Sequence, residues 1–143
     1  MTDARRIVVD TSALMSMVLG ERDEAWFAGE LVSAQQRLMS AGTVQEFLLV
    51  SSARLSAGSA TWRTADALAN AWAIIDGCDI EVVPVTGELA LIGASGVARF
   101  RGSPARLNFG DGFAYALAKV LDCPILCKGN DFAATDVRVI RPG

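Results

Sequence analysis

The chain has 143 residues, 52% of them hydrophobic, and a formal net charge of −3, which fits one folded domain spanning residues 1–143. Its 13 basic and 16 acidic residues argue against a protein that coats nucleic acid through bulk positive charge, and its apolar runs are too short to predict a membrane span. It has no histidine, which excludes Ser-His-Asp and Cys-His catalysis and histidine-ligated zinc.

Short β-branched runs alternate with stretches of helical hydrophobic spacing along the chain. In chain order we predict a strand at residues 5–10, helices at 13–19 and 21–34, a strand at 37–40, helices at 43–55 and 61–75, a strand at 80–85, a helix at 86–100, a loop at 101–110, a helix at 111–121, and strands at 124–127 and 137–140. This alternation predicts an α/β fold with a five-stranded parallel sheet flanked by helices on both faces.

The cysteines and the N-terminus bear on where the protein works. Cys78, Cys123 and Cys127 are odd in number and lack the spacing of a zinc knuckle, so we interpret them as reduced core thiols. Residues 1–10 lack the layout of a secretory signal peptide. We therefore expect a cytoplasmic protein without a membrane partner.

Acidic side chains recur near the carboxyl ends of the predicted strands. Asp10 ends the first strand, Glu46 lies in the first turn of the helix after the second, Asp111 opens a helix, and Asp131 follows the fourth strand. The last of these has Asn130 before it and Asp136 shortly after it. Parallel sheets place their working residues at this edge, so the acids converge if the fourth strand lies beside the first.

Converging carboxylates repel one another, and a hard divalent cation removes that cost. Mg²⁺ or Mn²⁺ held by a few carboxylates suits phosphodiester hydrolysis, because the cation activates water and stabilises charge on phosphate oxygens. In a chain without histidine, a metal-activated water is the expected nucleophile.

Each acid also has an interpretation without chemistry. Asp10 can cap the helix that follows it, as Thr11 and Ser12 also can. Glu46 can close a capping box with Thr43. The helix dipole favours Asp111, Asp131 is a common turn residue, and Asp136 can be a solvated acid.

Three segments resemble a known family. Asp10-Thr11-Ser12-Ala13-Leu14 resembles the opening motif of PIN domains, residues 108–119 (NFGDGFAYALAK) resemble the third acidic motif of VapC toxins, and residues 124–132 (PILCKGNDF), with Thr135-Asp136, resemble the last one. Glu46 falls where that family carries a helical glutamate. The two later motifs are specific, and the resemblance covers essentially the whole chain.

The resemblance implies a PIN-like fold and an Mg²⁺- or Mn²⁺-dependent endoribonuclease, with Asp10, Glu46, Asp111 and Asp131 as the metal-binding and catalytic acids. Ser12 and Asn130 would support them, with Asp136 as a less central member. The family also implies a homodimer and neutralisation by a cognate VapB-type antitoxin. Position 112 is glycine, a poor helix former, which we expect to loosen the helix start.

An RNA substrate needs cations and stacking surfaces beside the acids. Residues 99–106 combine Arg99, Arg101 and Arg106 with a phenylalanine shortly before Asp111, so these arginines are candidate RNA contacts. A solvated loop explains the segment equally well. Lys119 and Lys128 are further candidates, although Lys128 can pair with an acid instead.

Two rival functions fit parts of the pattern. A phosphoacceptor signalling domain also binds Mg²⁺ on a small parallel α/β fold, but it needs paired acids after the first strand and an acceptor aspartate after the third. Here the first strand ends in a single acid, and the third ends Val83-Pro84-Val85. A non-catalytic PIN-like binding module would use the acids only to hold a structural cation.

Overall fold

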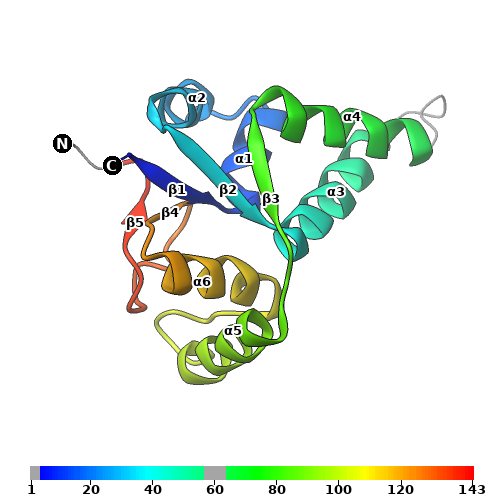
Figure 1. The fold of residues 1–143 in the computed structure, drawn as a ribbon. Helices are drawn as coiled ribbons and strands as arrows, with labels where there is room; N and C mark the ends of the chain where they lie inside the picture. The colour runs from blue at the N-terminus through cyan, green and yellow to red at the C-terminus, as the bar shows by residue number, and fades with distance from the viewer. Residues whose placement is uncertain (1–3, 57–63) are drawn as a thin grey trace.

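The computed structural model describes residues 4–56 and 64–143, and strands alternate with helices as predicted (Figure 1). In chain order the elements are β1 (Arg6–Val9), α1 (Thr11–Val18), α2 (Glu24–Ser33), β2 (Gln36–Ser40), α3 (Ala41–Ser56), α4 (Thr64–Gly77), β3 (Ile80–Val83), α5 (Gly87–Phe100), α6 (Phe109–Leu121), β4 (Ile125–Leu126) and β5 (Val139–Ile140). The start predicted for the fourth helix, residues 61–63 with Trp62, lies outside the described residues.

The five strands form one parallel sheet in the order β3-β2-β1-β4-β5. The central strand β1 pairs with β4 through Val8 opposite Ile125 and Val9 opposite Leu126. The predicted neighbourhood of the first and fourth strands is therefore confirmed, and the chain segments that follow them emerge side by side. The strand β3 lies at the edge of the sheet, away from β1, which removes the arrangement that a phosphoacceptor domain needs.

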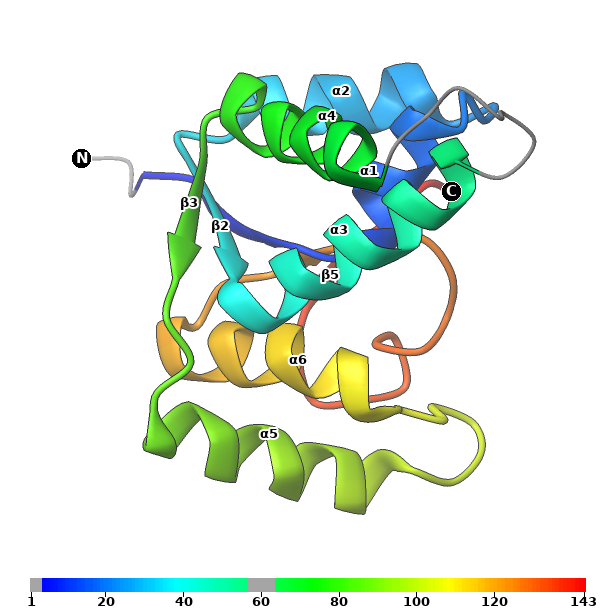
Figure 2. The ribbon, with the colours of Figure 1, turned by 90° about the vertical axis from the view of Figure 1, so that its right-hand side faces the viewer.

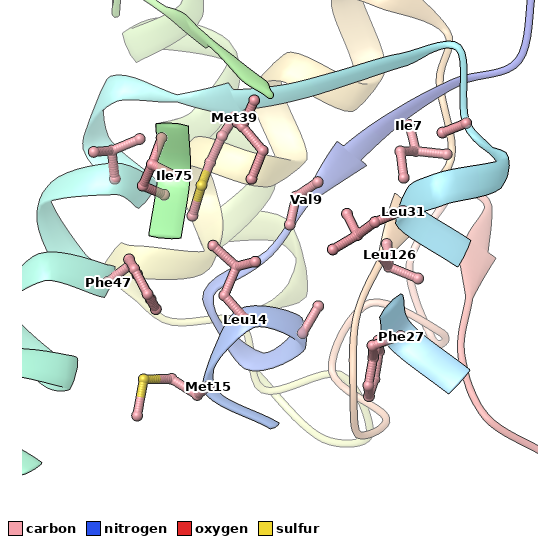
Figure 3. Close-up of a cluster of buried hydrophobic side chains, with 14 of the residues drawn as sticks. Ile7, Val9, Leu14, Met15, Phe27, Leu31, Met39, Phe47, Ile75 and Leu126 are labelled. Carbon is pink, nitrogen blue, oxygen red and sulfur yellow. The ribbon is translucent and has the colours of Figure 1, made fainter. Parts of the chain in front are cut away.

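Successive side chains of a strand point to opposite faces of the sheet, and helices cover both of these faces. Ile7 and Val9 belong to a core with residues of α1 to α4, which lie together on one side (Figures 1 and 3). Val8 points to the other core, which contains α6 side chains. Helix α5 packs on the outer side of α6 and forms a further layer (Figure 2).

Glycines allow α5 and α6 to touch. A Cβ atom on Gly93 would lie 2.8 Å from the carbonyl oxygen of Gly112, and one on Gly112 would lie 3.2 Å from the carbonyl oxygen of Gly93. Gly112 is buried within α6, and the helix begins two residues earlier than predicted. Gly112 permits close contact between the two helices, and the expectation that it loosens the helix start stays a prediction.

The structure also shows the character of the helices and the state of the three cysteines. None of the helices in the described residues combines the length and apolarity needed to cross a membrane. Cys78, Cys123 and Cys127 are free thiols, and the last two are buried, as expected for core cysteines.

Candidate active site

Asp10 follows β1 directly and caps α1. Its Oδ2 atom accepts hydrogen bonds from the backbone N–H of Ser12 (3.2 Å) and from the Ser12 hydroxyl (2.6 Å), so Asp10, rather than Thr11 or Ser12, is the N-cap. Its side chain is 7% exposed. Burial raises the pKa of Asp10 and the charge of Glu46 adds to this, while the bonds from Ser12 act in the opposite direction. Asp10 therefore both caps α1 and lies close enough to Glu46 for the two carboxylates to interact.

Ser12 links the ends of two neighbouring strands. Its hydroxyl donates to Asp10 and accepts a 2.9 Å hydrogen bond from the backbone N–H of Lys128, in the turn after β4. This bond ties the turn that leads to Asp131 to the carboxylate at the end of β1. The support that the family resemblance implied for Ser12 therefore has a concrete geometry.

We expect Ser12→Ala to reduce catalysis without unfolding the protein. Loss of a hydrogen bond that orients a metal ligand typically costs about 10–100-fold in activity. Ser16 gives a matched control on the same helix: its buried hydroxyl finds no hydrogen-bond partner among the described residues, so Ser16→Ala should leave the rate and the stability nearly unchanged. Rates on one RNA substrate and urea unfolding curves would test both, and equal rates for the two variants would contradict the role of Ser12.

Glu46 is not part of a capping box. Helix α3 begins at Ala41, so Thr43 lies inside the helix, and its hydroxyl is buried without a hydrogen-bond partner among the described residues. The Glu46 carboxylate instead turns toward α1, where its Oε1 atom accepts a 2.6 Å hydrogen bond from the Thr11 hydroxyl. The capping interpretation of Glu46 is therefore wrong.

Gly110 makes room for the other oxygen of Glu46. A Cβ atom on Gly110 would collide with Oε2 of Glu46 and would lie 2.9 Å from its Cδ atom. Sequence reasoning missed this residue, although a glycine in the first turn of a helix, next to a candidate acid, was a usable signal. The close contact joins α3 to the start of α6.

The capping box of this chain lies at Asp111. The backbone N–H of Asn108 donates to Oδ2 of Asp111, and the backbone N–H of Asp111 donates to Oδ1 of Asn108, both at 3.0 Å. Burial raises the pKa of Asp111 to about 6, against the hydrogen bond from Asn108. The charges of Asp10, Asp131 and Glu46 also contribute to this rise. The four acids from four separate segments therefore share one electrostatic neighbourhood.

Asp131 is exposed in the turn after β4, and several contacts hold that turn. Gly129 adopts a left-handed conformation with φ of 93°. The guanidinium of Arg141 donates to the Gly129 carbonyl at 3.3 Å and to Oδ1 of Asn130. Asn130 thus contacts the end of the chain beyond β5, and its side chain helps to shape the turn that carries Asp131.

Asp136 lies in a different set of contacts from the four acids. Its carboxylate accepts hydrogen bonds from the Tyr115 hydroxyl (2.8 Å) and from Nζ of Lys119 (3.0 Å), and Arg99 lies 3.6 Å away. Burial raises the pKa of Asp136, but the bonds from Lys119 and Tyr115 outweigh it and leave the pKa below its usual range. Asp136 thus lies against the middle of α6, and its role as a less central member of the site stays a prediction.

Some of the basic residues predicted to contact RNA pair with acidic side chains, and others are exposed. Arg99 pairs with Asp136 and lies 4.8 Å from the centroid of the Phe100 ring, while Lys128 pairs with Glu21 and Asp23 on the loop before α2. Arg101 and Arg106 are exposed. In the structure, the loop after α5 therefore offers these two arginines to an anionic ligand.

The donor set of the site suits a hard cation. Within the described residues, the hydrogen bonds given above engage one oxygen each of Asp10, Glu46 and Asp111, and the second oxygen of each carboxylate remains for another ligand. In the same part of the chain, no three acids or thiols stand close enough together to enclose an ion by themselves. Carboxylate oxygens are the donors that hard divalent cations prefer.

Comparison with known proteins gives the family. Residues 7–138 match the PIN domain family. VapC ribonuclease Mb0625 of Mycobacterium bovis is 37% identical to this chain over 135 residues, which cover 92% of this chain and 96% of the relative. Ribonuclease VapC42 of Mycobacterium tuberculosis is 33% identical over 135 residues, with 92% and 97% covered.

Two solved structures share the fold. The structure of VapC20 from Mycobacterium tuberculosis, a sarcin-ricin loop cleaving toxin, superposes with a TM-score of 0.73 at 20% identity and covers 95% of this chain and 99% of its own. VapBC-5 from the same species, a member of the VapBC family of toxin–antitoxin systems, gives a TM-score of 0.61 at 25% identity, with 96% and 98% covered. The sequence matches, and the fold they share with these structures, show that the chain belongs to the PIN-domain family, among the VapC ribonucleases.

Proposed function

We propose that this protein is an endoribonuclease toxin that hydrolyses RNA phosphodiester bonds with Mg²⁺ or Mn²⁺ bound by Asp10, Glu46, Asp111 and Asp131. The observation that carries the proposal is the convergence of acids from separate segments: β1 and β4, which precede Asp10 and Asp131, pair with each other, and Glu46 lies against Gly110, next to Asp111. Four acids from distant segments are costly to gather unless a cation offsets their charge. The names of the relatives support RNA as the substrate.

The residues of the site have different roles in this mechanism. Asp10, Glu46 and Asp111 are each oriented by a hydrogen bond to one oxygen, from Ser12, Thr11 and Asn108 respectively. These acids would hold a divalent cation, which when bound would acidify a water molecule and offset negative charge on the phosphate oxygens. Asp131, exposed at the rim, completes the donor set from the side of β4. Because the chain has no histidine, protons leave through water or carboxylates.

The proposal extends to partners. The relation to a VapBC toxin–antitoxin system supports a cognate VapB-type antitoxin that neutralises this chain, and the family resemblance supports a homodimer acting in the cytoplasm. Growth arrest upon expression, abolished by Asp111→Asn and relieved by the co-expressed antitoxin, is the expected cellular result.

A cleavage assay tests the metal requirement. Total cellular RNA is incubated with the protein in Mg²⁺, in Mn²⁺, or in chelator, and the 5′ ends of the products are mapped. We expect discrete cleavage with either cation, none in chelator, and recovery when cation is added back in excess. Asp10→Asn should be inactive, whereas Asp76→Asn, an exposed acid on α4, should cleave as the parent does. Cleavage that persists in chelator would overturn the mechanism.

A further inference from the structure

An apolar groove lies beside the acidic site. It has a volume of about 530 Å³ and lies between α5 and α6, with Gly93 and Val97 on one wall and Phe109, Gly112 and Phe113 on the other. The contact of Gly93 with Gly112 brings the two helix backbones together there.

Phe109 gives this groove an exposed aromatic surface. Its side chain is 81% exposed, which is unusual for a phenylalanine at the start of a helix whose other face is buried. The rings of Phe109 and Phe113 meet edge to face at 5.1 Å with an interplanar angle of 81°. This contact orients the Phe109 ring and leaves most of its surface open to a ligand.

The groove and the acids share a wall. Asn108 lines the groove and also exchanges two hydrogen bonds with Asp111. Phe109 is followed directly by Gly110, against which Glu46 lies. The groove is therefore connected to the acidic site through Asn108 and the first turn of α6.

Charge distinguishes the kinds of ligand that would fit. Arg101 lines the groove, and Arg106 is exposed on the same loop, although the chain as a whole is acidic. An apolar and aromatic surface between arginines and a cation site matches a nucleotide, whose base is apolar on its faces and whose phosphates are anionic. An apolar side chain of a protein partner would leave Arg101 without an anionic partner.

We propose that the groove between α5 and α6 binds an unpaired nucleobase of the RNA substrate, stacked on Phe109, with Arg101 contacting a phosphate next to it. This inference rests on the proposed ribonuclease function and assigns part of its substrate selection to residues outside the acidic site. The selected RNA is single-stranded at the bound position, because only an unstacked base can enter the groove.

Binding of a fluorescein-labelled uridine dodecamer RNA tests the groove. The protein carries Asp10→Asn to prevent cleavage, and affinity is followed by anisotropy in Mg²⁺. We expect Phe109→Ala to weaken binding by about 10-fold, since loss of one base–aromatic stack has an effect of this order. Phe109→Tyr should bind as the parent does, and Phe109→Leu should resemble Phe109→Ala. Leu91→Ala, a 70% exposed position on α5 outside the groove lining, is the matched control.

Salt dependence separates the two contacts. Arg101→Gln should lower the slope of log affinity against log salt by about 0.7, the value for one phosphate contact on a single strand. Phe109→Ala should leave that slope unchanged. Parental affinity of Phe109→Ala, or full rescue by Phe109→Leu, would overturn the proposal. A change in oligomeric state, measured by sedimentation, that accounts for the loss of RNA affinity would also overturn the proposal. The groove would then bind a second copy of the chain.

Failure of this inference is distinguishable from failure of the proposed function. If the unsubstituted protein cleaves cellular RNA and the Phe109→Ala variant binds the dodecamer normally, only the nucleobase site is wrong. If the unsubstituted protein neither cleaves nor binds RNA, the ribonuclease assignment itself fails, and the groove loses its proposed ligand with it.

Discussion

Asp111→Asn is expected to reduce the rate of RNA cleavage by more than about 100-fold, because residues that merely orient metal ligands already contribute about 10–100-fold. The amide oxygen can still accept the hydrogen bond from Asn108, so the fold of α6 should persist. Single-turnover cleavage in saturating Mg²⁺ measures the loss, with Asp76→Asn as control. A reduction of less than 10-fold would show that Asp111 is not a ligand that the reaction needs.

The same substitution should change how stability depends on pH in cation-free protein. The pKa of Asp111 in the folded chain, about 6, lies above its ordinary 3.8, so the folded state binds this proton more tightly than the unfolded state. The resulting stabilisation is fully present below pH 3.8 and is lost as pH rises through 6. A shift of this size corresponds to about 3 kcal/mol as an upper bound.

Urea unfolding in chelator between pH 4 and 7 measures this linkage. The free energy of unfolding of the parent should fall across that range, the fall should be smaller in Asp111→Asn, and Mg²⁺ should restore stability to the parent at pH 7. Identical pH profiles for the two proteins would contradict the raised pKa of Asp111.

Gly110→Ala is expected to decrease activity while leaving the protein folded. The added methyl group would collide with Oε2 of Glu46, and the flexible end of that side chain would have to leave its position. Alanine is the better helix former by roughly 1 kcal/mol at interior positions, so the thermal midpoint should stay level or rise. We expect cleavage to fall by about 10–100-fold, as for other disturbances of ligand placement.

A double-mutant cycle tests the cause of that loss. In a Glu46→Gln background, Gly110→Ala should add little to the loss of rate, because both changes act on the same carboxylate. Gly87→Ala, at a position in α5 with open space around it, should leave the rate unchanged in either background. Losses that multiply independently would show that the methyl group acts through something other than Glu46.

The layer order and the acid-bearing edge of this fold could be predicted because their signals are local. The strands β1 and β3 are short β-branched runs, Asp10 directly follows β1, and Asp131 lies in the turn after β4. Parallel pairing then places both at one edge of the sheet. The adjacency of β1 and β4 followed from the winding of the chain, and the pairing of Val9 with Leu126 confirms it.

The contacts of individual side chains could not be predicted, because they depend on helix starts and on packing. Helix α3 begins two residues earlier than predicted, which puts Thr43 in its interior and frees Glu46 to reach Thr11. Tyr115 reaches Asp136 across the gap between α6 and the loop before β5, a contact that no spacing in the sequence predicts. The groove beside Phe109 is lined by two glycines on separate helices, Gly93 and Gly112, whose contact no local pattern in the sequence predicts.

The position of β4 in the sheet has a consequence for the order in which the protein becomes active during synthesis. The segments that carry Asp10, Glu46 and Asp111 are all translated before β4, yet β4 supplies the neighbour of β1 and the turn that carries Asp131. The Lys128 amide that meets Ser12 also comes from this late segment. A nascent chain that has not yet exposed β4 therefore lacks both the neighbour of β1 and the fourth acid of the proposed site.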